Sequence, residues 1–454
     1  MGRCVTSPQN PRVESFTLPN GLDVALLARP QSPVVSSWVW YRVGSKNETP
    51  GATGAAHWLE HMLFKGSRNY AVGAIDRAIV EAGGNLNAFT DTDFTAYFIT
   101  VPRQHALLPL RIESDRMTGA TIPAPEVDKE REVVLSEREM NENHPVFRVE
   151  EEIFALAFHE HPYHWDPLGY AQDIRRITRD ELYRFYRRFY GPANASLVLA
   201  GGFDPGEIRR EIQKRFGAIS HETEDPRVPT EEPPQRGERR TTLRGPGSTP
   251  LVRIGWRVPS VLSPTAARFL MLDLYLGGEI PLYPSGTSWG RSREHPSARL
   301  YQALVDTGLA VSAGSDWRPR VHPSLFSVWA QAAPGVSLDR LEEAVRAEVD
   351  RVRRRRVDPG EMARLRAKLV QGARMGWEGS TRSGFRLGYF WALGGRHLDR
   401  AVLRECLRLR PGDIREAAEE IFQDDRATVV RYEAEPPSPD GRGRGSRVPR
   451  RRRS

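Results

Sequence analysis

Cysteine and long apolar runs are both scarce in this 454-residue sequence. Its 2 cysteines, Cys4 and Cys406, exclude a disulfide framework and any zinc site built from several thiolates. No apolar stretch approaches the roughly 20 residues that a membrane-spanning helix needs, so we expect no membrane span. The first residues lack the apolar segment of a secretory signal. These absences favour a cytoplasmic location and leave a periplasmic or secreted one open.

Basic charge is concentrated at the C-terminus. The formal net charge is +8, and residues 436–454 hold 7 arginines and 1 aspartate, which accounts for +6 of it. This segment of proline, glycine and arginine is predicted to be a disordered tail, with electrostatic contact to an acidic partner as the alternative. Because the rest of the chain is nearly balanced in charge, no nucleic-acid binding is expected.

The length and the distribution of proline and glycine predict more than one domain. Two segments with similar patterns, "AIVEAGGNLNAFTDTDFTAYFITV" and "QALVDTGLAVSAGSDWRPRVHPSLFSVWAQA", each run from a helix through a strand and a turn into a second strand. We therefore predict an α+β protein with two related domains, each a mainly antiparallel β-sheet covered by helices on one face, enclosing a cleft. The expected division is an N-terminal domain at 12–220, a linker at 221–250, a C-terminal domain at 251–435 and the tail at 436–454.

Two histidines and a glutamate lie close together in "HWLEH", residues 57–61. On a helix, residues four apart project from one face, so His57 and His61 could share a metal ion. Glu60 lies near that face, where a carboxylate can accept a proton from water. A catalytic zinc uses three protein ligands and leaves a fourth position open, so a third ligand is required. The alternative is an ordinary polar helix face.

Candidates for the third ligand lie in "KEREVVLSEREM", a predicted helix at residues 129–140. Glu130 and Glu137 are two turns apart and share one face. Glu132 and Glu139 form a second such pair. The spacing alone does not choose between the two faces.

Four stretches resemble the catalytic half of the pitrilysin/insulysin family of zinc peptidases, the inverzincins that include mitochondrial processing peptidase. They are "HWLEH", "EAGGNLNAFTDTDFTAYF", "EREVVLSEREM" and "HPYHWDPLGYAQDIRRITRDELYRFYRRFYGPANASLVLAGGFD". The resemblance implies one Zn²⁺ held by His57, His61 and Glu137, with Glu130 supporting the ligands from behind. It further implies a zinc endopeptidase that hydrolyses peptides or unfolded protein segments, with Glu60 activating water.

The same family binds an extended peptide as an added strand at a sheet edge. The resemblance places that edge at Asn87, Ala88 and Phe89. Without the resemblance, Asn87 would be interpreted as an ordinary turn residue.

The second half of the sequence departs from the family pattern. Members of the family carry an arginine and, seven residues later, a tyrosine that help hold the substrate and the oxyanion. Aligned on Gly308, these positions hold Leu304 and Val311, which cannot donate a side-chain hydrogen bond. Because the chain resembles the zinc-bearing subunit of two-chain members, we expect a homologous partner subunit to supply the arginine and tyrosine.

Two further interpretations compete with the peptidase. One is a non-catalytic or weakly active structural subunit of a heterodimeric, peptidase-like complex. The intact set of His57, Glu60, His61 and Glu137 disfavours it, because a structural relic has no need of a base. The other is a basic adaptor recruited through the arginine-rich tail, which rests on those arginines alone.

Overall fold

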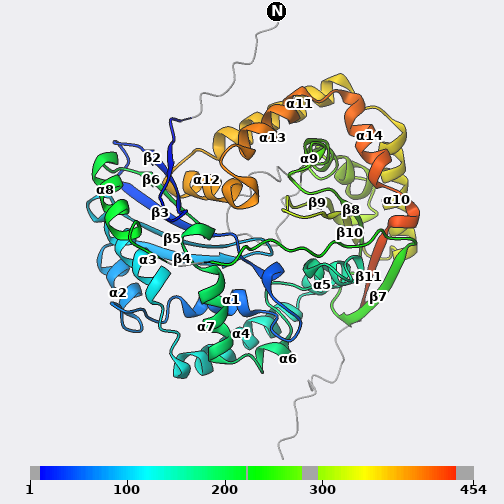
Figure 1. Ribbon diagram of the computed structural model, residues 1–454. Coiled ribbons are helices and arrows are strands. Elements are labelled where there is room, and N and C mark those ends of the chain that lie inside the picture. Colours follow the sequence, from blue (N-terminus) through cyan, green and yellow to red (C-terminus); the bar gives the residue numbers. More distant parts are fainter. Residues whose placement is uncertain (1–10, 221–222, 279–294, 436–454) are drawn as a thin grey trace, which may run out of the picture.

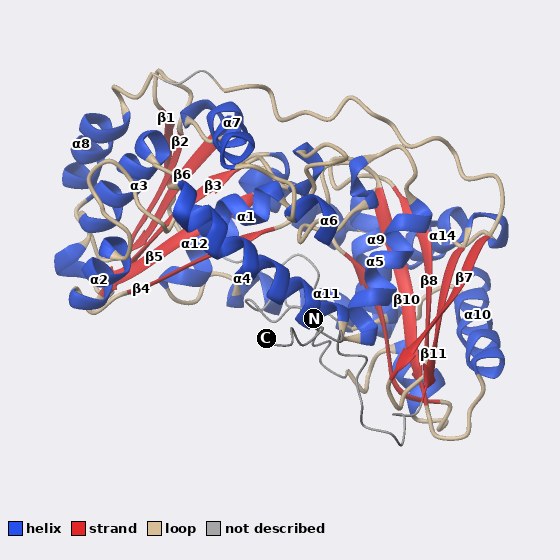
Figure 2. Cartoon of the chain, turned by 90° about the horizontal axis from the view of Figure 1, so that it is seen from below, coloured by secondary structure: helices blue, strands red, loops and turns tan. Residues whose placement is uncertain are grey.

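The computed structural model describes residues 11–220, 223–278 and 295–435. The strands form two separate sheets that stand at opposite ends of the molecule, with helices between them (Figures 1 and 2). The predicted α+β class with two domains is confirmed. The expected tail at 436–454 lies outside the described residues.

The first sheet has six strands in the order β1-β2-β6-β3-β5-β4. All neighbours are antiparallel except β2 and β6, which are parallel. Odd-numbered residues of β3, such as Val35, Val39 and Tyr41, face a core formed with the N-terminal helices. The strands are β1 (Glu14–Thr17), β2 (Asp23–Ala28), β3 (Val34–Tyr41), β4 (Asn85–Thr90), β5 (Thr95–Pro102) and β6 (Ala195–Gly201). The helices of this half are α1 (Ala55–Met62), α2 (Ala74–Glu81), α3 (Leu108–Gly119), α4 (Ala124–Glu142), α5 (Pro145–Ala157), α6 (Ala171–Ile174), α7 (Arg179–Phe189) and α8 (Pro205–Phe216).

The second sheet has five strands in the order β7-β11-β8-β10-β9 and repeats the pairing of the first. β7 and β11 are parallel, as β2 and β6 are, and β9 occupies the edge that β4 occupies in the first sheet. The two domains are thus related in topology, as the sequence patterns predict. The strands are β7 (Arg239–Pro246), β8 (Leu251–Val258), β9 (Ala310–Trp317), β10 (Ser324–Ala332) and β11 (Thr428–Glu435). The helices are α9 (Ala266–Leu276), α10 (Leu338–Arg354), α11 (Pro359–Met375), α12 (Ser380–Gly394), α13 (Leu398–Arg408) and α14 (Pro411–Ile421).

The expected linker at 221–250 needs one correction. Its last part forms β7, so the second sheet begins inside the segment expected to connect the domains. β7 lies at a sheet edge and its residues are largely half-buried or exposed. An edge strand of this kind needs no apolar alternation, which is why the sequence pattern did not show it.

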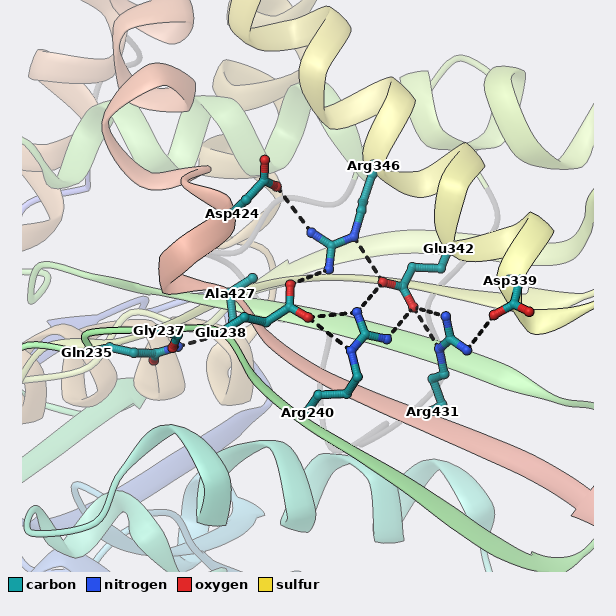
Figure 3. A network of polar contacts seen from close by, with 10 residues as sticks. All are labelled: Gln235, Gly237, Glu238, Arg240, Asp339, Glu342, Arg346, Asp424, Ala427 and Arg431. Atoms are coloured by element: carbon teal, nitrogen blue, oxygen red, sulfur yellow. Dashed lines mark hydrogen bonds and ion pairs between the residues drawn. The ribbon is translucent and has the colours of Figure 1, made fainter.

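A network of arginines and carboxylates fixes β7 to its neighbours (Figure 3). Glu342 of α10 is buried and accepts hydrogen bonds from Arg240 of β7, Arg346 of α10 and Arg431 of β11. Although burial alone would raise the pKa of Glu342, the three arginines lower it to about 2. The carboxylate is therefore ionised at neutral pH and joins two strands to one helix.

Each sheet receives one helix from the other half of the chain. α12 packs on the face of the first sheet that carries Trp38 and Trp40, opposite the N-terminal helices. α5 packs on the second sheet, where Ile153 contacts Gly255. Two apolar contacts of this kind join the halves into one body.

Glycine permits the close approach of α12. An added Cβ at Gly384 would lie 2.3 Å from Cδ1 of Trp38, and one at Gly388 would lie 1.8 Å from Nε1 of Trp40. Any larger residue would clash with a buried indole ring at either position. α12 is thus shaped to lie directly on the first sheet.

A buried polar cluster also joins the halves. Asp93, in the turn between β4 and β5, contacts Lys46 Nζ at 3.0 Å and accepts a hydrogen bond from the hydroxyl of Tyr163 at 2.8 Å. It also accepts one from the backbone N–H of Val321, in the turn between β9 and β10 of the second half. Although burial would raise the pKa of Asp93, Lys46 and Arg320 lower it. The turn after β4 is therefore anchored to both halves.

No helix among residues 11–220, 223–278 and 295–435 is both long and apolar enough to cross a membrane.

Candidate metal centre and its comparison with known proteins

The helix α1 carries the "HWLEH" stretch and is buried along most of its length. His57 and His61 lie one turn apart, with ring centroids 4.8 Å from each other. Burial, together with the neighbouring His61, lowers the pKa of His57 to about 3. The His57 imidazole is therefore neutral at physiological pH, which is the form that binds metals.

Glu137 of α4 meets these two histidines. Its Oε2 lies 3.6 Å from Nε2 of His57 and 3.6 Å from Nε2 of His61. One donor atom from each of the three residues can be chosen so that all lie within 4.8 Å of one another. In a tetrahedral zinc site with bonds of about 2.0 Å to nitrogen and oxygen, neighbouring donors are about 3.3 Å apart. The three side chains fit such an ion with small adjustments.

Glu130 lies on the same face of α4 as Glu137 and contacts the other ring nitrogen of His61. Its Oε2 is 3.0 Å from Nδ1 of His61, and its Oε1 is 2.5 Å from Nζ of Lys65. Burial would raise the pKa of Glu130, but the hydrogen bonds from Lys65 and His61 lower it. An ionised carboxylate at Nδ1 leaves Nε2 of His61 free to face Glu137. The structure thus brings the Glu130 and Glu137 pair, and not Glu132 and Glu139, to the histidines.

Glu60 is buried beside this cluster and contacts the end of β4. The hydroxyl of Thr90 donates a hydrogen bond of 2.7 Å to its Oε2. Burial and the charge of Glu137 raise the pKa of Glu60 to about 8, against the opposing effect of Thr90. A carboxyl group with a raised pKa is suited to accept a proton and release it again.

A cavity of about 360 Å³ opens next to Glu60 and His61. Phe64, Lys65, Val72 and Asn87 are among the residues that line it. The cavity borders β4, the edge strand of the first sheet. An unpaired strand edge beside a metal centre can receive an extended peptide through backbone hydrogen bonds.

The three residues predicted to bind substrate have different environments. Asn87 is exposed and lines the cavity. Ala88 is buried in the core between the first sheet and the N-terminal helices, and Phe89 packs against Trp40 and Phe385. Only Asn87 presents its side chain to the cavity, so Ala88 and Phe89 could contact a peptide through their backbone alone.

The two positions that depart from the expected arginine and tyrosine lie in the second domain. Leu304 is fully buried in the large apolar core that includes α9 and the second sheet, and Val311 is exposed on the edge strand β9. Arg299, a nearby basic residue, forms an ion pair with Glu348 at 3.2 Å. This arginine therefore has a structural partner within its own domain.

Sequence reasoning missed Lys65 and Thr90. Thr90 lies two residues after Ala88 in β4, so it faces α1 on the same side of the strand. Lys65 lies four residues after His61, which indicates a position close to the same face of the chain. The spacing of both residues can be taken from the sequence, but its use requires knowing which side of each element faces the histidines.

Two imidazoles and a carboxylate around one point, with a buried glutamate and an open cavity beside them, are residues of the kind that mononuclear hydrolytic metal centres use. Comparison with known proteins agrees with this class. The family profile described as Insulinase (Peptidase family M16) matches residues 23–167, and that described as Peptidase M16 inactive domain matches residues 176–369. Together they cover most of the chain, which belongs to peptidase family M16, the insulinase family.

Individual relatives match over nearly the whole length. Zinc protease PqqE of Helicobacter pylori is 28% identical over 428 residues, covering 92% of this chain and 92% of its own. The probable mitochondrial-processing peptidase subunit beta of Arabidopsis thaliana is 25% identical over 398 residues, covering 87% of this chain and 73% of its own. The crystal structure of a protease from Helicobacter pylori has a TM-score of 0.85 at 26% identity, covering 93% of this chain and 100% of that one.

Proposed function

We propose that this chain is a zinc-dependent endopeptidase that hydrolyses peptides or unfolded protein segments. The convergence of His57, His61 and Glu137 next to Glu60 is the observation that carries the proposal. Relatives named as zinc proteases support the choice of metal. A zinc ion held by these three residues would polarise the scissile carbonyl and make a nearby water more acidic.

The side chains of this chain have distinct tasks in that reaction. Glu60 accepts the proton of the attacking water and delivers it to the leaving amine. Thr90 holds Oε2 of Glu60, which fixes the direction in which the carboxylate faces. The edge of β4 near Asn87 holds the peptide in an extended form, which favours unfolded substrates with little sequence preference.

We further propose that a homologous partner subunit completes the site. Leu304 and Val311 supply neither a charge nor a hydrogen-bond donor where an arginine and a tyrosine are expected. Removing one donor to a developing oxyanion costs about 10²–10³ in rate in a well-studied protease, so the chain alone should be a slow enzyme.

A second candidate function follows from the same two positions. Leu304 is fully buried in an apolar core, and residues 176–369 match the profile described as an inactive domain. The chain would then be a non-catalytic or weakly active structural subunit of a heterodimeric, peptidase-like complex. In that case, the metal ligands would contribute stability and Glu60 would have no role.

Cleavage of an internally quenched peptide separates these functions. The chain is assayed alone and together with a homologous chain that carries the arginine and tyrosine, with Glu60→Gln as the control. We expect slow cleavage alone, faster cleavage with the partner, and none with Glu60→Gln in either sample. If neither sample cleaves, or if Glu60→Gln cleaves as well as the unmodified chain, the endopeptidase proposal is wrong.

A further inference from the structure

No side chain of the N-cap residue caps the start of α1. Its N-cap residue is Gly54, with φ of 89° and no side chain to accept a hydrogen bond. A Cβ added at this position would lie 2.8 Å from the backbone oxygen of Leu168. Since neither the backbone conformation nor the space admits serine, threonine or aspartate, the first N–H groups of α1 need acceptors from elsewhere.

Glu48 supplies those acceptors from six residues upstream. Its Oε2 accepts a hydrogen bond from the N–H of Gly54 at 2.9 Å, and its Oε1 accepts one from the N–H of Ala56 at 2.8 Å. The residue is 5% exposed. Burial raises the pKa of Glu48 to about 8, against the opposing effect of the hydrogen bonds from Ala56 and Gly54. In its ionised form the group also interacts favourably with the helix dipole. Ala56 immediately precedes His57, so this contact ends one residue from a proposed zinc ligand.

The residue before Gly54 is fixed as well. Both the N–H and the hydroxyl of Thr53 donate to Oδ2 of Asp173, at 3.2 Å and 2.7 Å. The N–H of Tyr170 donates to the same hydroxyl at 2.8 Å. Within the segment 53–56, three backbone N–H groups are therefore held by carboxylates from outside the helix.

The two histidines differ in how their rings are oriented. His61 contacts Glu130 through Nδ1. Nδ1 of His57 is buried and has no hydrogen-bond partner among residues 11–220, 223–278 and 295–435. The direction of the His57 ring is thus set by the backbone of α1 and by packing, without an oriented acceptor at its second nitrogen.

We propose that Glu48 is a positioning residue for this metal centre: its carboxylate fixes the first turn of α1 and thereby aims His57 at the position shared with His61 and Glu137. Glu48 acts through the backbone of Gly54 and Ala56. The inference rests on the proposed zinc peptidase function, which it extends by one residue outside the ligand set.

The test compares Glu48→Gln with Asp358→Asn in the full-length chain. Asp358 caps α11 by the same chemistry, accepting hydrogen bonds from the N–H groups of Gly360 and Glu361 at 2.7 and 3.3 Å, but it lies in the second half of the chain. Zinc affinity is measured by competition with a chelator, and kcat and KM are measured on the quenched peptide. Thermal unfolding of the metal-free chains reports the loss of stability in each variant.

We expect Glu48→Gln to weaken zinc binding at least tenfold and to lower kcat with little change in KM, while Asp358→Asn leaves both constants unchanged. Glu48→Asp keeps the two carboxyl oxygens with a shorter reach and should lie between Glu48→Gln and the unmodified chain; it also serves if Glu48→Gln does not fold. Zinc affinity and kcat in either Glu48 variant equal to those of Asp358→Asn would overturn the proposal. If the unmodified chain binds zinc but cleaves nothing, the peptidase proposal fails, and the zinc affinities still decide the role of Glu48.

Discussion

The close packing of α12 on the first sheet predicts the effect of a substitution at Gly388. Gly388→Ala adds a Cβ that would lie 1.8 Å from Nε1 of Trp40 and 2.2 Å from its Cδ1, whereas ordinary contacts are 3.4–4 Å. The helix or the indole ring must therefore move by about 1.5 Å. Trp40 is fully buried and stacks on Trp38, so neither can yield without disturbing the core.

The gain in helix propensity from alanine is too small to offset this clash, so the net effect on stability is unfavourable. Alanine is favoured over glycine in a helix interior by about 1 kcal/mol. Overpacking a core costs about 1–3 kcal/mol, and a clash this short belongs at the upper end of that range. We expect Gly388→Ala to lower the free energy of unfolding by about 2 kcal/mol, which for a chain of 454 residues lowers the Tm by about 2 °C.

Gly412 provides the matched control. It lies in the first turn of α14, and an added Cβ there meets no atom within 4 Å. Gly412→Ala should leave the Tm unchanged or raise it, since only the propensity gain remains. Both variants are followed by differential scanning calorimetry and by tryptophan fluorescence. A Tm for Gly388→Ala equal to or above that of Gly412→Ala would refute the packing of α12 described above.

Three further outcomes follow from the buried polar groups. Glu342→Gln should lower the free energy of unfolding by about 3 kcal/mol at pH 7, because the folded pKa of Glu342 is about 2, below the usual 4.5. This stabilisation is lost as the pH falls from 4.5 through 2. The stabilities of the two chains in urea unfolding should therefore converge in acid. Burial lowers the pKa of His161 in the folded chain to about 4. As the pH falls, the unfolded chain binds this proton before the folded chain does, so stability should fall between pH 6.5 and 4. His161→Asn should show a shallower dependence of Tm on pH, and an unchanged slope would contradict this. Thr90→Val should lower kcat up to about tenfold with KM unchanged, since an intramolecular hydrogen bond contributes about 0.5–1.5 kcal/mol. Peptide cleavage at an undiminished rate would show that Thr90 does not orient Glu60.

The parts of the site that lie on one helix could be predicted from the sequence. His57, Glu60 and His61 share one turn of α1, so helical spacing alone placed them together. Glu137 could not be chosen over Glu139 by spacing, because both have a partner two turns away. The choice depends on how α4 is rotated against α1, which spacing within a single helix cannot define.

The features that the sequence did not reveal depend on contacts between distant segments. Phe385 and Tyr389 would form an apolar helix face whichever sheet α12 covered. The sequence of α12 therefore does not show that this helix packs on the first sheet. β7 looked like a linker because an exposed edge strand has no apolar alternation. Glu48 reaches α1 across a loop, outside the capping pattern that is read from adjacent residues.

The central claim is that His57, His61 and Glu137 together bind one zinc ion, and metal content measures it most directly. Purified chains are stripped of metal, reloaded with limiting Zn²⁺, dialysed and analysed for zinc by mass spectrometry. The unmodified chain and Glu139→Gln, a control on the other face of α4, should each hold one zinc per chain, and Glu60→Gln should as well because Glu60 is not a ligand. His57→Ala and Glu137→Gln should hold almost none. Stoichiometric zinc in either of these two variants would contradict the site.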